Sequence, residues 1–432
     1  MYNINEHIKK KLINKYRGSE RKETVILDDG NTYLIKMPDK TREVNRRLSY
    51  INNAISEYLG CKIIESIGLD VQEVKLGEYK TTSTDGENKS YIVCACKDFV
   101  PIGYSLAEAE ITSLGSENSK SAKDASFETI KNISNVIEGI SENELMSFYA
   151  KQFIADALIG NKDRHNGNWG FITGPKYNKI APIYDCGSSL CPLLDDSELT
   201  ENKARNMAIN STSVIVDHEE RIHYFDYISS GKNRYVTNAL KEMLPSINLN
   251  TINRIIDETP YISEKRKSFY KEYEKTAYEN NLLQSFYLIQ KRDIEPNTKE
   301  NNDILYAFYK HKIKDIKELE TFEKIDFEIK DFKCQAMKAS NKFALIIKDG
   351  KAIGVLPIRS NSEEIREAID ILSKISGIER LELISVATRE SSYKLPGNEN
   401  LNSVMGDDVE EYNLNSDEGD YEEDYDEEDY EL

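Results

Sequence analysis

Three polar side chains in the middle of the chain have the types and the spacing that a transfer reaction needs. Asp163 is followed five residues later by Asn168, and Asp185 stands further on, directly before Cys186 and Gly187. An aspartate on a loop is suited to accept a proton, and carboxylate and carboxamide oxygens are ligands of a hard divalent ion such as Mg²⁺. Asp163 is therefore a candidate base, and Asn168 and Asp185 are candidate metal ligands.

The spacing of these residues is the one that phosphoryl transfer uses in protein kinases. In those enzymes a catalytic aspartate is followed at the same interval by an asparagine, and a later Asp-x-Gly motif supplies a second metal ligand. The order of residues around the base differs here. The chain reads Asp163-Arg164-His165 where protein kinases read His-Arg-Asp.

A helical pattern leads into the loop that carries Asp163. Apolar residues recur at helical spacing from residue 145 to residue 158, after a capping box formed by Ser141 and Glu144. Gly160 offers a C-terminal stop for this helix. The candidate base is therefore expected just beyond the end of a packed helix.

A hairpin pattern follows the same loop. Residues 169–172 predict a short strand, residues 173–178 predict a turn, and the apolar run 180–184 predicts the second strand. Because the two strands of a hairpin lie close together, we expect the candidate base and the two candidate metal ligands to converge on one place.

The N-terminal part of the chain predicts antiparallel strands, one of which ends in a lysine. The strand-like segments are residues 24–27, 33–36, 71–77 and 91–96. Lys36 stands at the end of the second segment, after a turn at Asp28–Asn31. The segment Lys97–Pro101 interrupts the pattern and is expected to form a hinge between two lobes, with backbone groups available to an adenine ring.

A long helical pattern between these strands carries a glutamate that needs a partner. The pattern runs from Val44 to Ile63, and Glu57 lies off its main apolar stripe on a smaller second face. An unpaired buried carboxylate is costly, so Glu57 needs a partner. Lys36 is the expected one, because it would match the strand-lysine to helix-glutamate pair that positions ATP in protein kinases. The alternatives are a surface glutamate on an amphipathic helix, or Glu43 as the spare candidate for the same role.

Two further regions bear on the site. Residues 104–140 are polar and rich in serine, and they are expected to form a mobile insertion at the lobe boundary. Residues 200–290 are mainly helical by pattern, and the polar segment Asn206–Ser213 is where a substrate-facing loop is expected.

The segment Asn161–Asn168 before an aromatic strand, together with Ile55–Leu59, resembles the HipA-like serine/threonine protein kinases, and within them the CtkA-like group. The resemblance covers about residues 15–290. It implies an α+β, bilobal protein-kinase-like fold with a β-rich N-lobe and a helical C-lobe. It also implies ATP and Mg²⁺ as cofactors, a protein substrate and the capacity for autophosphorylation.

The resemblance gives roles to residues of the loop that carries Asp163 and Asn168, called the central loop below. Asp163 would be the base or the carboxylate that orients the acceptor hydroxyl, and Asn168 and Asp185 would hold the metal and with it the nucleotide. His165 is included with the catalytic residues, although bracing the loop is the role expected of it.

The resemblance also assigns residues of the N-lobe to nucleotide binding. Lys36 would contact the ATP phosphates and Glu57 would tether it. Ser19 and Lys22 occupy the place of a phosphate-covering loop, and Ser19 is the position where autophosphorylation would switch the activity off.

Composition limits the partners and the compartment. The formal charge is -19, but residues 407–432 hold 15 Asp or Glu and no Lys or Arg, so the rest of the chain is nearly balanced and gives nucleic-acid binding no support. No apolar run is long enough to span a membrane and the N-terminus lacks a signal-peptide core, so a cytoplasmic protein is expected. The six cysteines have no Cys-x-x-Cys spacing and are expected to be reduced and buried.

These patterns predict four parts of the chain. They are a kinase-like N-lobe at residues 1–103, a C-lobe at 104–295, a small α+β accessory domain at 296–396 and a disordered acidic tail at 397–432. A kinase of small molecules or lipids on the same fold and a non-catalytic binding module are the alternative functions. An antitoxin-like or regulatory protein partner is a further expectation from the family.

Overall fold

A computed structural model gives the fold of the 432-residue chain. It describes residues 2–12, 22–38, 52–82, 88–113, 125–217, 220–292, 301, 304, 324–329, 332–338, 343–349 and 351–357. The chain divides into two compact units at Ala387 and Thr388, and the second unit lies outside the described residues, as does the predicted acidic tail. The predicted boundaries after residues 103, 295 and 396 stay predictions.

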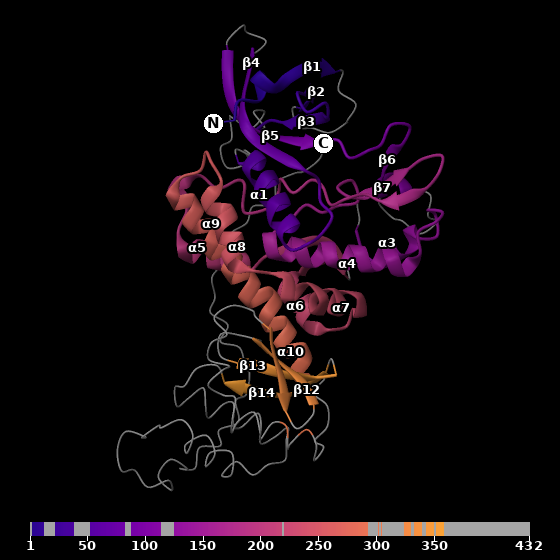
Figure 1. Ribbon diagram of the computed structural model, residues 1–432, viewed down its shortest axis with the longest axis vertical. Helices are drawn as coiled ribbons and strands as arrows, with labels where there is room; N and C mark the ends of the chain where they lie inside the picture. The colour runs from indigo at the N-terminus through magenta and orange to yellow at the C-terminus, as the bar shows by residue number, and fades with distance from the viewer. Residues whose placement is uncertain are drawn as a thin grey trace. The chain divides into compact units, whose positions relative to one another are not determined.

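A five-stranded antiparallel sheet forms the N-terminal lobe, in the spatial order β1-β2-β3-β5-β4 (Figure 1). The strands are β1 (Ile8–Leu12), β2 (Lys22–Leu27), β3 (Thr32–Lys36), β4 (Val74–Thr82) and β5 (Asn88–Lys97). The four predicted strands are confirmed, while β1, which follows a short 3-10 helix at Ile4–His7, was not predicted. Gly30 turns the chain between β2 and β3 with a φ of 80°, a conformation that glycine adopts without strain.

One helix, α1 (Asn53–Ser66), packs against β4 and β5 of this sheet (Figure 1). The predicted helix began nine residues earlier, at Val44, but residues 39–51 lie outside the described residues. Helix α1 is covered on two sides, which explains why its sequence shows two apolar faces. Its buried residues are Asn53, Ala54, Ile55, Ser56, Glu57, Leu59, Gly60, Cys61, Ile63 and Ile64.

A three-stranded antiparallel sheet lies next to the central loop, in the order β6-β7-β8. Its strands are β6 (Ser105–Glu108), β7 (Gly170–Thr173) and β8 (Asn178–Ile180). The predicted hairpin is present as β7 and β8, but its second arm lies at Asn178–Ile180 and not at the predicted 180–184, so the prediction of that strand is wrong except at Ile180. After Ile180 the chain leaves the sheet, and Ile183 instead forms an isolated bridge with Val71.

The prediction of a mobile insertion at residues 104–140 is wrong for the part of it that the structure describes. Strand β6 pairs along its length with β7, and it is followed by α2 (Ala109–Ser113) and α3 (Phe127–Ile133). Helix α3 packs on the long central helix and buries Ile130 and Ile133. The sequence did not predict these elements because none of them fully buries more than two side chains.

The long central helix is α4 (Glu142–Ile159), and its two ends are as predicted. The Ser141 hydroxyl accepts the backbone N–H of Glu144 at 3.2 Å, and Gly160 ends the helix in the left-handed conformation with a φ of 64°. A Cβ atom at Gly160 would collide with the side chain of Tyr273. The start of the central loop is therefore fixed both by backbone conformation and by packing.

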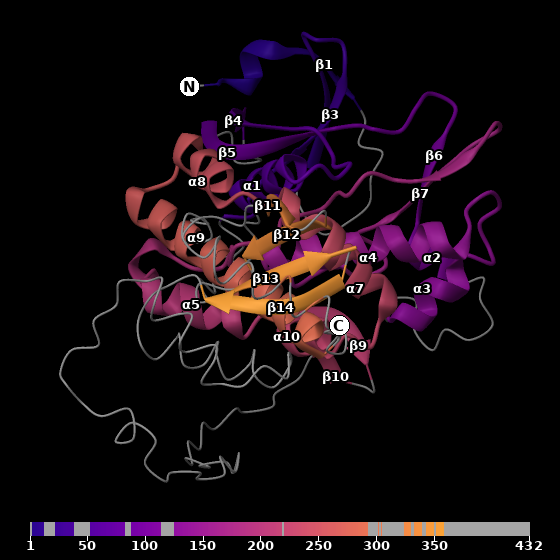
Figure 2. The same cartoon turned by 60° about the horizontal axis from the view of Figure 1, so that its bottom comes forward.

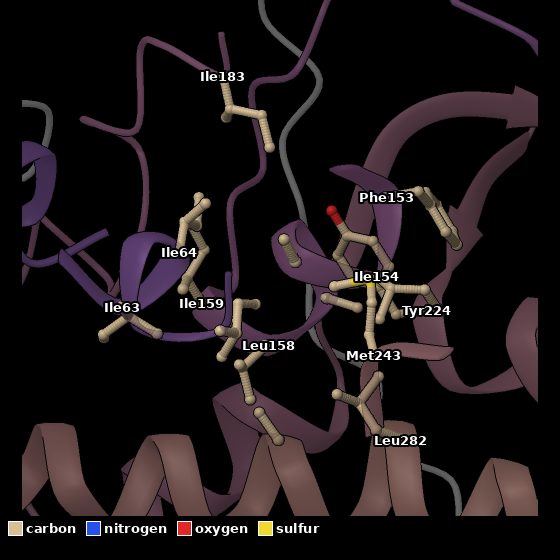
Figure 3. Packing of buried hydrophobic residues seen from close by; sticks show 14 of the residues in the cluster. Ile63, Ile64, Phe153, Ile154, Leu158, Ile159, Ile183, Tyr224, Met243 and Leu282 are labelled. Carbon is tan, nitrogen blue, oxygen red and sulfur yellow. The ribbon is translucent and has the colours of Figure 1, made fainter. Parts of the chain in front are cut away.

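Helix α4 carries the core that lies below the central loop. Leu158 and Ile159 of α4 lie beside Ile63 and Ile64 of α1 (Figure 3), and all four belong to one buried hydrophobic cluster. The same cluster continues into the helical lobe through Phe153 and its neighbours. One continuous core therefore supports both the helix that carries Glu57 and the loop that carries the candidate base.

The helical lobe follows after residue 200, as predicted, but it contains a hairpin that was not predicted. Its helices are α5 (Glu201–Ile209), α6 (Tyr224–Ser230), α7 (Arg234–Met243), α8 (Leu249–Glu258), α9 (Glu264–Thr276), a π-helix (Ala277–Gln284) and α10 (Ser285–Arg292). Strands β9 (Thr212–Asp217) and β10 (Glu220–His223) form the hairpin, and two short 3-10 helices lie at Asp196–Glu198 and Leu244–Ser246. The substrate-facing loop expected at Asn206–Ser213 is wrong, because these residues form the end of α5 and the start of β9.

The described residues after 320 form a four-stranded antiparallel sheet in the order β11-β12-β13-β14 (Figure 2). The strands are β11 (Lys324–Ile329), β12 (Phe332–Lys338), β13 (Phe343–Lys348) and β14 (Lys351–Pro357). These four strands lie within the small α+β accessory domain predicted at residues 296–396, whose boundaries stay predictions.

Two general features of the described residues bear on the sequence predictions. All six cysteines are free and buried, as predicted. A search of the described helices finds none that is long and apolar enough to cross a membrane. The predicted cytoplasmic location stays a prediction.

Candidate active site

A buried lysine joins the sheet, helix α1 and the segment that follows β8. The Nζ atom of Lys36 donates to Glu57 Oε2 at 2.9 Å and to Asp185 Oδ1 at 2.7 Å. Glu57 is fully buried and the Lys36 side chain is 8% exposed, whereas the Asp185 side chain is 31% exposed. The expected contact between Lys36 and Glu57 is therefore present, and the contact of Lys36 with Asp185 joins the N-lobe to the candidate metal ligand.

Asp163 and Asn168 lie on the same tight loop after α4. The Asn168 side-chain amide donates to the Asp163 backbone carbonyl at 2.6 Å, which turns the Oδ1 atom of Asn168 away from that carbonyl. The Asp163 side chain is 49% exposed, while Asn168 is 9% exposed. The loop thus presents a reachable carboxylate beside an amide oxygen that is free to accept a further bond.

His165 holds the turn that follows Asp163. The backbone N–H of Gly167 donates to His165 Nδ1 at 3.0 Å, so the proton of the neutral ring resides on Nε2. That Nε2 atom lies 3.9 Å from Asp163 Oδ1, which is beyond hydrogen-bond distance. The geometry favours the bracing role for His165, and its inclusion among the catalytic residues stays a prediction.

The two candidate carboxylates have pKa values shifted in opposite directions. Burial raises the pKa of Asp163, and nearby Asp185 raises it further, while His165 and the arginines Arg164 and Arg221 oppose the shift. Burial would also raise the pKa of Asp185, but Lys36, with help from Lys22 and Arg164, outweighs it and lowers the pKa to about 2. Asp163 is thus the stronger proton acceptor, and Asp185 is held as an anion.

The backbone of Asp185 is held in an unusual conformation. Its φ is 59°, in the left-handed region that residues other than glycine seldom occupy. Strained backbone of this kind clusters at functional sites, where the surrounding structure holds it. Here Lys36 bonds to the side chain, and the neighbouring residues are held by the arginine described next.

Arg164 and Asp156, for which no role was predicted, form a buried ion pair under the site. Arg164 Nε lies 2.9 Å from Asp156 Oδ2 and Nη2 lies 3.0 Å from Asp156 Oδ1, and both side chains are 2% exposed. The one sign of this ion pair in the sequence is Asp156, a single carboxylate inside the apolar stretch at the end of α4. Such a residue needs a buried cationic partner, but the helical pattern does not say which.

Two residues beside the site, Lys22 and Glu108, bear on its electrostatics. Lys22, at the start of β2, pairs in register with Lys36 of β3, so both side chains are on one face of the sheet. Lys22 lowers the pKa of Asp185. The pKa of half-buried Glu108 is raised by burial and by Glu110, and Lys22 opposes this rise. Glu108 was not predicted, because β6 itself was not predicted.

Mg²⁺ fits the donor set of this site better than a metal that needs several protein ligands. Among the described residues there is no group of three or more His, Cys, Asp or Glu side chains that could hold a metal ion. Mg²⁺ is usually held by one or two carboxylates together with phosphate oxygens and water. Asp185 and the Oδ1 atom of Asn168 can provide such a partial site, and their assignment as metal ligands stays a prediction.

Two of the predicted nucleotide-lobe residues cannot be placed. Ser19, the predicted site of autophosphorylation, and Glu43, the spare partner for Lys36, both lie outside the described residues. The roles given to Lys36, Glu57, Lys22 and the loop residues also stay predictions, although the contacts described above bring those residues together.

In the N-lobe a sheet lysine pairs with a helix glutamate. Beside this pair lie a segment that carries one carboxylate and a loop that carries a second carboxylate and an amide, which is the arrangement of kinases with two lobes. The chain belongs to the family described by the HipA-like C-terminal domain, whose model matches residues 9–248. It is 36% identical over 264 residues to the serine/threonine-protein kinase CtkA of Helicobacter pylori, an alignment that covers 59% of this chain and 78% of CtkA.

Two solved structures extend the comparison. The crystal structure of the proinflammatory kinase CtkA of Helicobacter pylori matches with a TM-score of 0.58 at 30% identity, covering 66% of this chain and 98% of that one. The Shewanella oneidensis HipA in complex with HipB and operator DNA matches with a TM-score of 0.40 at 14% identity, covering 61% of each chain. The protein is therefore an enzyme of the kinase class with a bilobal α+β fold.

Proposed function

We propose that the protein transfers the terminal phosphoryl group of ATP to a serine or threonine hydroxyl of a protein, with Mg²⁺ as the metal. The observation that carries the proposal is the position of Lys36, which bonds to both Glu57 and Asp185. In kinases a lysine–glutamate pair places the lysine against the nucleotide phosphates, and the metal-binding aspartate lies beside them. The similarity to CtkA, a serine/threonine-protein kinase, supports the choice of acceptor.

In the proposed reaction Asp163 accepts the proton of the acceptor hydroxyl, and the oxygen of that hydroxyl forms a bond to the terminal phosphorus of ATP. The bond from that phosphorus to the bridging oxygen breaks, and ADP leaves. Lys36 would donate to phosphate oxygens of the bound nucleotide, and Asp185 and Asn168 would hold the metal. Bound Mg²⁺ would neutralise charge on the phosphates, and the raised pKa of Asp163 makes its carboxylate a better proton acceptor.

The finer predictions belong to the same proposal. We include autophosphorylation, with Ser19 as the acceptor that switches the activity off, and a cytoplasmic location. A regulatory or antitoxin-like protein partner is part of the same proposal.

The test is the intact mass of the purified chain after incubation with ATP and Mg²⁺. The native chain should gain mass in steps of one phosphoryl group, and Asp163→Asn should slow the gain about 100-fold or more, as expected for loss of a catalytic base. Asp185→Asn should have an effect of similar size. Asp257→Asn is the matched control, since Asp257 lies on α8 and its side chain is also 49% exposed.

The possible outcomes separate three functions. Mass gain by the native chain and the control alone supports the proposal, and peptide mapping then tests Ser19. Stabilisation by nucleotide in a melting curve without mass gain would indicate an acceptor other than the chain itself, such as a small molecule or a lipid. Neither mass gain nor stabilisation would refute the kinase proposal and favour a binding module.

A further inference from the structure

Arg164 is the residue through which the two loops of the candidate site are tied together. Besides its two bonds to Asp156, its Nη1 atom donates to the backbone carbonyl of Asn168 at 2.9 Å and to the backbone carbonyl of Tyr184. Its Nη2 atom lies 3.6 Å from the sulfur of Cys186. One guanidinium group therefore contacts one candidate metal ligand and both chain neighbours of the other, Asp185.

Asp156 is held in turn by the residue that leads into the loop. The side-chain amide of Asn161 donates to Asp156 Oδ1 at 3.1 Å, and its side-chain oxygen accepts the backbone N–H of Asp163 at 3.1 Å. The hydroxyl of Tyr224, on α6, donates to the backbone carbonyl of Asn161 at 2.7 Å. The candidate base is thus tied by two hydrogen bonds to the carboxylate that fixes Arg164.

The geometry of arginine suits this position in a way that the geometry of lysine does not. A guanidinium group is planar and offers five N–H donors in a fixed fork, so its bonds to Asp156 set the direction of its bonds to the two carbonyls. Those carbonyls belong to segments that are joined by no strand pairing at this point, since β8 ends at Ile180. Arg164 and Asp156 are both buried, so water does not offer these groups a substitute.

We propose that Arg164, oriented by Asp156, is a positioning residue that sets the distance and the angle between the loop of Asp163 and Asn168 and the segment of Asp185. It touches neither nucleotide nor acceptor. Its loss therefore changes how well the two metal ligands act together, and with it the rate of phosphoryl transfer. The effect on rate rests on the proposed function, whereas the effect on loop geometry does not.

Trp169 provides a readout that does not depend on activity. It is the single tryptophan of the chain, it is 1% exposed, and it follows Asn168 directly. Its indole N–H donates to the side-chain oxygen of Asn166 at 3.2 Å. Its fluorescence therefore reports on the loop that Arg164 holds.

The experiment compares Arg164→Lys with Arg266→Lys in the full chain. Arg266 is a matched control, because it is also buried, it pairs with Asp196, and it donates to the backbone carbonyl of Leu194 at 2.8 Å, all outside the site. Arg164→Lys should lower the rate at saturating ATP at least 10-fold and raise the Mg²⁺ concentration for half-maximal rate several-fold. It should also increase quenching of Trp169 by acrylamide. Arg266→Lys should lower the melting temperature alone.

The proposal is overturned if Arg164→Lys keeps the native rate, Mg²⁺ dependence and Trp169 quenching, or if Arg266→Lys alters them equally. Should Arg164→Lys fail to fold, Asp156→Asn takes its place, because it keeps the shape of the side chain and removes the charge that orients Arg164. If the native chain transfers no phosphate at all, the proposed function fails, and the comparison of Trp169 quenching still decides the positioning role.

Discussion

Replacing Lys36 with methionine should separate the stabilising role of this lysine from its role in the reaction. Methionine keeps the length of the side chain and removes its charge. Glu57 would then be a fully buried carboxylate whose remaining side-chain partner among the described residues is the thiol of Cys61, 3.9 Å away. Asp185 would lose the same partner, but its side chain is 31% exposed and water can replace the lost bond.

The magnitude follows from this difference in exposure. Leaving one member of a buried ion pair without its partner costs about 3–5 kcal/mol of unfolding free energy, and here that cost falls almost wholly on Glu57. Glu57→Gln alone should cost about 1–2 kcal/mol, because Lys36 keeps its bond to Asp185. The double variant has no unpaired buried charge at this place. It should be about 2 kcal/mol more stable than Lys36→Met.

The assay is urea denaturation of the four proteins, followed by their rates of phosphotransfer. Lys36→Met and the double variant should both be at least 100-fold slower than the native chain, so the second substitution restores stability without restoring the rate. If the double variant is no more stable than Lys36→Met, the buried carboxylate does not carry the cost. Recovery of the rate along with stability would show that Lys36 acts only by holding the fold.

Two further predictions concern Glu274 and Gly60. Burial raises the pKa of Glu274 well above its usual 4.5, and neither carboxyl oxygen has a hydrogen-bond partner among the described residues. The pKa of Glu274 is higher in the folded protein than in the unfolded chain. The contribution of protonated Glu274 to stability is therefore complete below pH 4.5 and is lost as the pH rises through the folded-state pKa. The unfolding free energy of the native chain should therefore fall by about 1.4 kcal/mol more per pH unit than that of Glu274→Gln between pH 5 and pH 6, and parallel curves would refute this. In Gly60→Ala the new Cβ atom would lie 2.8 Å from the Cβ atom of Cys186, so α1 must move away from the segment that carries Asp185. Phosphotransfer by this variant should slow about 10-fold. Lys62→Ala, on the same helix, is the control and should leave the rate unchanged.

Much of the local structure near the site was readable from the sequence. The period of apolar residues, the serine cap and the glycine stop predicted helix α4 with its ends, because these signals act within a few residues. The family could be identified from the spacing of Asp163, Asn168 and Asp185 and from the short sequence segments around them. Strand β6 and helices α2 and α3 were missed, because each contributes few buried residues to a core built mainly by others.

What only the tertiary structure decided is which buried charges meet. Lys36 is 21 residues from Glu57 and 149 from Asp185 in the chain, and of these two contacts the one with Asp185 could not be read from any local pattern. The pairing of Arg164 with Asp156 was missed for the same reason. A period of apolar residues says that a side chain is buried, but the partner of a buried charge depends on which elements pack against one another. That packing is set by contacts between distant segments, so the sequence by itself determined the chemical groups of this site and the fold determined their arrangement.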